Sequence, residues 1–252
     1  MRRTKIFAVA GLLTCCLAVA ARAQDGVPIE MLQRTLLIRH DTTVGTAFEL
    51  QRHDRKYLIT ARHMVAGLPD KGAAIQVMRS DKWTDCKMVR TLFPKSPAVD
   101  IAVFETAEAV GTPDYVGTAE NGTGGATFGQ NLWFLGFPYG LGTHIPTQAG
   151  GVFYPFIKHG ILSAIDSSNP DAGIIFIDGH DNPGFSGGPV LFIDLSDKQY
   201  KILSVVSGYR LEATQAAVDG KVVDSPLLAN SGIIQTYSIK YALEAIDGAE
   251  SH

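Results

Sequence analysis

Short runs of apolar and β-branched residues recur along the whole chain, and residues that favour turns separate them. In the first half the runs are Gln33–His40, Val44–Leu50, Lys56–Thr60, Ala74–Arg79, Lys87–Leu92 and Ile101–Phe104. In the second half they are Gln130–Phe137, Gly151–Phe156, Gly160–Ile165, Gly173–Asp178, Pro189–Ile193, Lys201–Val206 and Ile233–Tyr237. Runs of this length are typical of β-strands, and their spacing indicates a barrel or sandwich rather than alternating strands and helices. The sequence therefore predicts an all-β protein.

A glycine-rich, weakly patterned stretch, Thr106–Gly129, separates the two sets of runs. It predicts two packed units, residues 24–112 and 113–252. One helix is expected at the end of the second unit, over residues 238–247, with Ser238 as N-cap. Its apolar face comprises Ile239, Ala242, Leu243 and Ile246. The polar segment Tyr209–Asn230 is expected to be a long surface loop.

The first 23 residues have the pattern of a secretory signal peptide: a basic head, the uncharged apolar run Ile6–Ala20, and small residues at Ala21 and Ala23. We therefore expect an exported protein, periplasmic or secreted. Cys15 and Cys16 raise the alternative of a lipidated cysteine, but the small-residue cleavage signature downstream is better formed. The apolar run is shorter than the roughly 20 residues that span a bilayer, so no membrane insertion is expected.

Removal of residues 1–23 takes away four positive charges and no negative ones, which changes the formal net charge from -3 to -7. A nucleic-acid partner is not expected, because binding to phosphates needs a basic surface. Cys86 is the only cysteine in the remaining chain, so no internal disulfide is expected. The histidines are scattered and show no metal-binding spacing, so neither a metal nor a cofactor is expected.

The segment Gly184-Phe185-Ser186-Gly187-Gly188 is the strongest chemical signal. A serine between glycines can sit on a tight turn whose backbone N–H groups converge, as a nucleophile with an oxyanion hole requires. The alternatives are an incidental glycine-rich turn and the nucleophile elbow of α/β-hydrolases. The elbow needs a histidine after the serine, and only the terminal His252 follows Ser186. The elbow interpretation therefore fails.

Two further residues precede the serine in an informative order. His63 follows a strand-like run in Thr60-Ala61-Arg62-His63, and Asp100 opens the apolar run Asp100-Ile101-Ala102-Val103. Singly, each has an ordinary explanation as a surface or turn residue. The order His63, Asp100, Ser186 is that of the chymotrypsin-type catalytic triad, which predicts these three as catalytic residues.

The chain resembles trypsin-like serine peptidases of the chymotrypsin fold, and within them the bacterial HtrA (Deg) branch, from Val44 to Ile246. The segments that carry the resemblance are Gly45–Phe48, Thr60–His63, Asp100–Val103, Gly136–Gly142, Gly160–Ala164 and Asn182–Pro189. It implies two six-stranded antiparallel β-barrels with the active site between them, His63 and Asp100 on the first and Ser186 on the second. It also implies that Ser186 attacks a peptide carbonyl, with the backbone N–H groups of Gly184 and Ser186 forming the oxyanion hole.

The resemblance also suggests substrate-contacting residues, and the chain differs from related enzymes at some positions. His180, Ser207, Gly208 and Tyr209 are expected to contact substrate, and His180 stands where trypsin-like enzymes place the acid that selects lysine or arginine. Phe185 replaces the aspartate that pairs with a newly cut amino terminus in pancreatic-type enzymes. Few residues follow the expected helix, so no PDZ domain is expected. We expect an exported serine endopeptidase acting on polypeptides; the alternative is a catalytically silent or partner-activated peptide-binding protein of the same fold.

Overall fold

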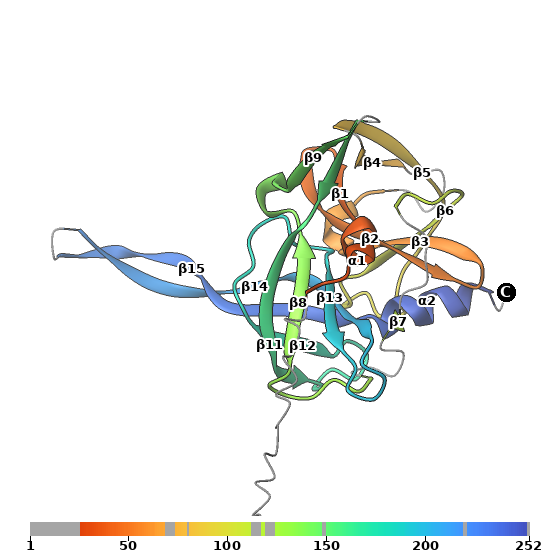
Figure 1. Cartoon of the computed structure of the whole chain (residues 1–252). Coiled ribbons are helices and arrows are strands. Elements are labelled where there is room, and N and C mark those ends of the chain that lie inside the picture. Colours follow the sequence, from red (N-terminus) through yellow and green to blue (C-terminus); the bar gives the residue numbers. More distant parts are fainter. Residues whose placement is uncertain are drawn as a thin grey trace, which may run out of the picture.

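Two β-barrels, one from each half of the chain, make up most of the structure, which is a computed structural model (Figure 1). It describes residues 26–68, 74–79, 81–111, 117–118, 124–147, 150–218 and 221–250. The expected signal peptide, residues 1–23, lies outside the described residues.

A short helix, α1 (Ile29–Gln33), leads into the first barrel. Its strands are β1 (Thr35–His40), β2 (Thr43–Arg52), β3 (Arg55–Thr60), β4 (Ala74–Arg79), β5 (Lys82–Leu92) and β6 (Ala102–Thr106). They are antiparallel neighbours in the order β1-β2-β3-β6-β5-β4, and β4 closes the barrel by pairing with β1. Each strand overlaps one of the runs expected from the sequence.

The second barrel contains β8 (Asn131–Gly136), β11 (Phe156–Asp166), β12 (Ile174–Asp178), β13 (Pro189–Ile193), β14 (Tyr200–Val218) and β15 (Lys221–Ser238). Their order is β13-β8-β11-β12-β15-β14, and the β13–β14 pairing closes the barrel. A two-residue strand, β7 (Gly117–Thr118), pairs in parallel with β14 outside it. The prediction of two six-stranded antiparallel barrels is confirmed.

One expected barrel strand belongs elsewhere. The run Gly151–Phe156 corresponds mainly to β10 (Gly150–Tyr154), which pairs only with β9 (Thr143–Thr147) in a separate hairpin. A run of apolar residues marks a strand but does not say which sheet it joins, because pairing depends on contacts distant in sequence.

Successive residues along the central strands of the first barrel alternate between two clusters. One cluster fills this barrel, and the other lies at the interface with the second barrel. Ala47, Leu58 and Phe104 belong to the core of the first barrel. Their neighbours Phe48, Ile59 and Val103 belong to a larger cluster with residues of the second barrel, such as Phe185 and Val206. Since successive side chains in a strand point to opposite faces, one set fills the barrel and the other packs the two barrels together.

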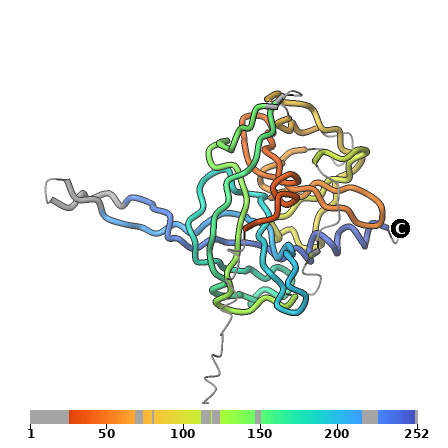
Figure 2. Tube along the Cα trace, in the orientation of Figure 1, coloured from red at the N-terminus to blue at the C-terminus, as the bar shows by residue number. Residues whose placement is uncertain are grey.

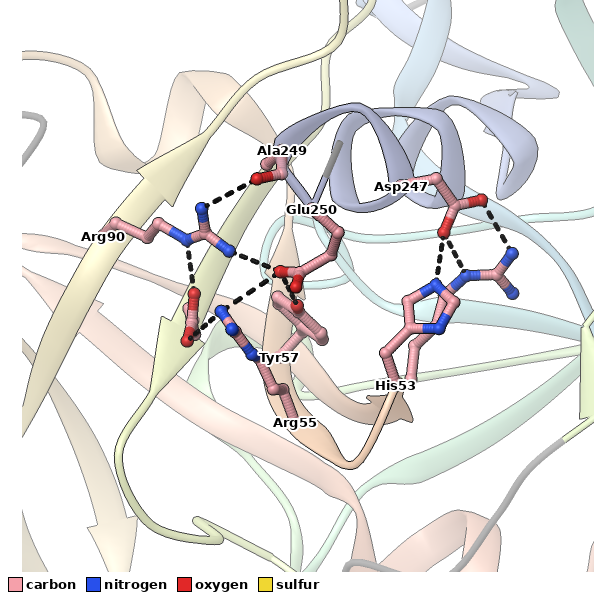
Figure 3. A network of polar contacts seen from close by, with 9 residues as sticks. His53, Arg55, Tyr57, Arg90, Asp247, Ala249 and Glu250 are labelled. Atoms are coloured by element: carbon pink, nitrogen blue, oxygen red, sulfur yellow. Dashed lines mark hydrogen bonds and ion pairs between the residues drawn. The ribbon is translucent and has the colours of Figure 1, made fainter. Parts of the chain in front are cut away.

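The chain ends in helix α2 (Lys240–Glu250), which confirms the predicted C-terminal helix although it begins two residues later and ends three residues later than expected. The Lys240 backbone N–H donates to Ser238 Oγ at 3.3 Å. The polar side of α2 is bound to the first barrel: Arg52 and His53 contact the Asp247 carboxylate, and Arg55, Tyr57 and Arg90 contact Glu250 (Figure 3). The helix therefore links the end of the chain to the first half.

The segment Tyr209–Asn230 is not a loop, so that prediction is wrong. Strands β14 and β15 continue past the barrel as a paired ribbon, from Leu211 opposite Asn230 to Val218 opposite Lys221. We call residues 211–218 and 221–230 the arm; Figure 1 and the coloured part of Figure 2 show it extending sideways, away from both barrels. Leu211, Leu227 and Leu228 are exposed on it. The strands of the arm were not predicted because a ribbon outside the core lacks the burial that produces regular apolar alternation.

Candidate active site

His63 and Asp100 come together because their strands are neighbours. His63 lies in the 3₁₀ turn η1 (Arg62–Val65) just after β3, Asp100 lies just before β6, and β3 pairs with β6. Asp100 Oδ1 accepts the His63 backbone N–H at 2.8 Å, and Asp100 Oδ2 is 2.7 Å from His63 Nδ1. An ionised carboxylate only accepts, so it requires the ring proton on Nδ1 and leaves Nε2 as the basic nitrogen.

A third hydrogen bond reaches Asp100 from the second barrel. The hydroxyl of Ser207, in β14, donates to Asp100 Oδ2 at 2.6 Å. Burial alone would raise the pKa of Asp100, but the hydrogen bonds from His63 and Ser207 outweigh burial and hold the pKa below its usual value. Asp100 is therefore an anion at neutral pH, able to orient the imidazole.

Ser186 lies in the loop between β12 and β13, against the first barrel. Its carbonyl accepts the backbone N–H of Thr46 in β2 at 3.0 Å. The next residue, Gly187, has φ of +86°, and a Cβ there would collide with the Thr46 carbonyl oxygen. Only glycine allows this close approach of the two barrels.

The hydroxyl of Ser186 donates to the Ser207 carbonyl oxygen at 3.0 Å. Ser207 thus contacts Ser186 through its carbonyl and Asp100 through its hydroxyl, which brings all three predicted residues around one position of β14. Within the described part of the chain, Ser186 and His63 share no hydrogen bond. Ser207 was expected to contact substrate; its bond to Asp100 was missed, because no local pattern links residues 107 positions apart.

Gly184 has an unusual backbone geometry, with φ of +107°. A Cβ there would collide with the Phe137 carbonyl oxygen, and the Gly184 carbonyl accepts the Thr46 hydroxyl at 2.6 Å. The preceding carbonyl, of Pro183, accepts the Tyr139 backbone N–H at 2.7 Å. C=O and N–H point in opposite directions across a trans peptide, so the Gly184 N–H faces away from Tyr139. Neither this N–H nor that of Ser186 donates to an atom of the described chain.

The remaining expected substrate contacts are His180, Gly208 and Tyr209. His180 is exposed, and its carbonyl accepts the amino group of Lys158 at 2.7 Å. Gly208 and Tyr209 continue β14 directly after Ser207 and pair with Gln235 and Ile234 of β15. Of the expected substrate contacts, His180 alone lies in the loop that carries Ser186.

Asp181 is a buried acid that the sequence did not predict, and the partly buried Lys158 is close enough to act on it electrostatically. Asp181 is 1 % exposed, and its Oδ1 has no hydrogen-bond partner. Burial raises the pKa of Asp181 to about 7, although the positive charge of Lys158 opposes the change. Since Lys158 lies on β11, 23 positions before Asp181, only the folded barrel brings the two together.

The described residues contain no group of three or more histidine, cysteine, aspartate or glutamate side chains that could hold a metal ion. Among the helices of those residues, none has the length and apolar character needed to cross a membrane.

Comparison with solved structures shows the same fold. The Rv3671c protease from M. tuberculosis H37Rv, as a serine-to-alanine mutant in its inactive form, matches with a TM-score of 0.54 and 18% identity, over 88% of this chain and 89% of that one. The active form of the same protease matches with a TM-score of 0.54 and 19% identity, over 87% of this chain and 82% of that one. The HtrA-type protease AlgW with a tripeptide gives 0.54 and 19%, over 86% of this chain and 60% of AlgW. No curated protein sequence matches the chain.

Sequence comparison agrees with the fold. A family model described as the trypsin-like peptidase domain matches residues 45–196, which include His63, Asp100 and Ser186. The match spans more than half of the chain and includes strands of both barrels. On these grounds the chain belongs to the trypsin-like peptidases.

Proposed function

We propose that the protein is a serine endopeptidase in which Ser186 is the nucleophile, His63 the general base and acid, and Asp100 the residue that orients the imidazole. The observation that carries the proposal is the convergence on Ser207: its hydroxyl binds Asp100, Asp100 binds His63 Nδ1, and its carbonyl binds the Ser186 hydroxyl. Three side chains far apart in sequence thereby meet at one residue between the barrels. The trypsin-like family supports the same reaction class.

The chemistry follows from the atoms available. A rotation of the Ser186 hydroxyl towards His63 Nε2 lets the imidazole take its proton while Oγ attacks a peptide carbonyl, and the imidazolium then protonates the leaving amine. Asp100 stabilises the imidazolium. The N–H groups of Gly184 and Ser186 are free to bind the oxyanion, a contribution of roughly 3 kcal/mol per donor. Water then hydrolyses the acyl-enzyme.

A fluorophosphonate probe tests the proposal, because it reacts with an activated serine and leaves a covalent mass increase. We expect the mature chain to be labelled once, at Ser186, and the Ser186→Ala variant not to be labelled. The exposed Ser168→Ala variant is the matched control and should label at the wild-type rate. Labelling that survives in Ser186→Ala would exclude Ser186 as the nucleophile.

A second candidate is a peptide-binding protein of the same fold that is silent or becomes active only with a partner. The bond of the Ser186 hydroxyl to the Ser207 carbonyl, instead of to His63, favours it. A folded chain that binds peptides but neither reacts with the probe nor cleaves a mixed peptide library would support this candidate. Labelling of the isolated chain at a rate typical of active serine peptidases would reject it.

We also propose that the protein is exported and that residues 1–23 are removed. The basic head, apolar run and small residues at Ala21 and Ala23 support this. Expression of the full chain in a bacterial host, followed by amino-terminal sequencing of the periplasmic fraction, should give a chain beginning at Gln24. Retention of the full-length chain in the cytoplasm would contradict export.

A further inference from the structure

The loop from His180 to Ser186 carries both the serine and the free N–H groups, so its shape determines whether the site works. The loop connects β12 to β13, and side chains outside it also contact it. Phe185 anchors one end: it is fully buried and packs edge-on against Phe134 of β8, with ring centroids 5.3 Å apart.

Lys158 binds the same loop from strand β11. Its amino group donates to the His180 carbonyl at 2.7 Å and to Asn182 Oδ1, and lies 5.3 Å from the centroid of the Phe185 ring. A single side chain therefore contacts three residues of the loop, including the buried anchor. An ordinary surface lysine keeps its ammonium group in water. Lys158 instead directs its ammonium group at three partners in the loop.

The environment of Lys158 keeps it directed at the loop. Burial lowers the pKa of Lys158, and the negative charge of Asp181 opposes that change. The partly buried ammonium has carbonyl, amide and aromatic partners, and each of these favours its charge. Displacing Lys158 would leave the His180 carbonyl and Asn182 Oδ1 without this donor.

The contacts of Lys158 continue to the free N–H of Gly184. The Asn182 carbonyl accepts the Phe185 backbone N–H at 3.2 Å, so a fixed Asn182 also fixes the turn from residue 182 to 185. Within that turn the Pro183 carbonyl binds the Tyr139 N–H, which orients the Gly184 N–H. A turn released at Asn182 can rotate the peptide between Pro183 and Gly184 and withdraw the N–H from the site.

We propose that Lys158 is a positioning residue that holds the His180–Ser186 loop in the shape needed for oxyanion binding. This inference rests on the proposed function. Position 185 carries no charge, so no ion pair there can hold the loop. Lys158, from the neighbouring strand, and the buried Phe185 ring would hold it instead. Lys158 itself touches no reacting atom.

The test compares Lys158→Met, which keeps the length and removes the charge, with Lys201→Met. Lys201 lies in the same barrel and binds Asp194 and Asp197, neither of which belongs to the loop, so Lys201→Met also loses two polar contacts. Amide hydrogen exchange at Phe185, Gly187 and Gly188 reports on the loop in the full mature chain. We expect these amides to exchange 10- to 100-fold faster in Lys158→Met and at the wild-type rate in Lys201→Met.

Activity provides the second measurement. In Lys158→Met we expect kcat on a cleavable peptide, and the rate constant of fluorophosphonate labelling, to fall 10- to 100-fold, while KM stays within about twofold and the final labelling stoichiometry stays at one. A purely structural lysine would lower the amount of active protein rather than the rate per site. Lys201→Met should keep both values.

The outcomes separate the two proposals. Unchanged loop exchange in Lys158→Met, or faster exchange with unchanged kcat, would overturn the role of Lys158. A wild-type chain that neither labels nor cleaves would refute the proposed function, and loop exchange would still decide whether Lys158 holds the loop. If Lys158→Met does not fold, Asn182→Ala removes one acceptor instead, and the same exchange and rate changes are expected.

Discussion

Replacing Asp181 by asparagine should raise the free energy of unfolding, relative to that of the wild type, more at pH 8 than at pH 4. The carboxyl is buried with one oxygen unpartnered, and burial raises its pKa from 3.8 to about 7. Between these pH values the folded chain keeps the proton on Asp181 and the unfolded chain releases it. Stability therefore falls as pH rises from about 4 to about 7 and then levels off. Asparagine cannot ionise, so the variant escapes that loss.

The size of the effect follows from the same two values. A difference of about 3 pH units, at about 1.4 kcal/mol each, makes the free energy of unfolding of wild type fall by about 4 kcal/mol relative to Asp181→Asn between pH 4 and pH 8. For a chain of this size, that corresponds to a relative shift in thermal midpoint on the order of 10 °C. Any constant cost of placing an amide beside Lys158 cancels, because only the change of the difference with pH is used.

Urea unfolding of both proteins at several pH values between 4 and 8, followed by the fluorescence of Trp83 and Trp133, measures the difference directly. Asp171→Asn, at an exposed aspartate of the same barrel, is the control and should track the wild type at every pH. A stability difference between Asp181→Asn and wild type that does not change with pH would refute the reasoning. It would mean that water or a rearranged Lys158 already solvates the carboxylate in the folded protein.

Three further predictions concern the loop, the helix and the arm. Gly184→Ala should lower kcat/KM for peptide cleavage by at least 100-fold with the fold retained, because a Cβ collides with the Phe137 carbonyl and displaces an oxyanion donor; a near-normal value would contradict the role of Gly184. Asp247→Asn should cost about 1 kcal/mol in thermal unfolding at low salt, and less in 1 M NaCl, because the carboxylate of Asp247 is paired with Arg52 but part-exposed; equal loss at both salt concentrations would contradict an ionic contribution. Replacing residues 212–229 by an Asn-Gly turn should leave the thermal midpoint within roughly 3 °C, since the described residues of the arm pair only with one another; loss of the folded state would show that the arm supports the barrel.

The strands of the first barrel were predicted from local sequence patterns, and the candidate catalytic residues partly from their order in the chain. The runs of the first barrel are set by local alternation, and each overlaps a strand, although β5 begins five residues before the expected Lys87. His63 and Asp100 were predicted as catalytic residues from their order in the chain and from their places beside strand-like runs, and they meet because those strands are neighbours. Whether these residues act on a peptide bond stays a prediction for the labelling experiment.

Features that depend on distant partners were missed. The arm was predicted to be a loop because its strands lie outside the core. Strand β9 was not predicted, and the run that forms β10 was placed with the barrel strands because its partner was unknown. The bond from Ser207 to Asp100 and the pairing of Lys158 with the loop join residues on different elements, so no local spacing encodes them. Asp181 reads in the sequence as an ordinary turn residue, and only its burial makes it unusual.

The arm also changes how the molecule moves through solvent. Residues 211–218 of β14 extend about 26 Å at 3.3 Å per residue, whereas a compact body of this chain length has a radius of gyration of about 17 Å. A thin rod on a near-spherical particle adds friction out of proportion to its mass. In sedimentation the monomer should therefore travel more slowly than a globular protein of equal weight, and its elution volume alone would overstate its mass.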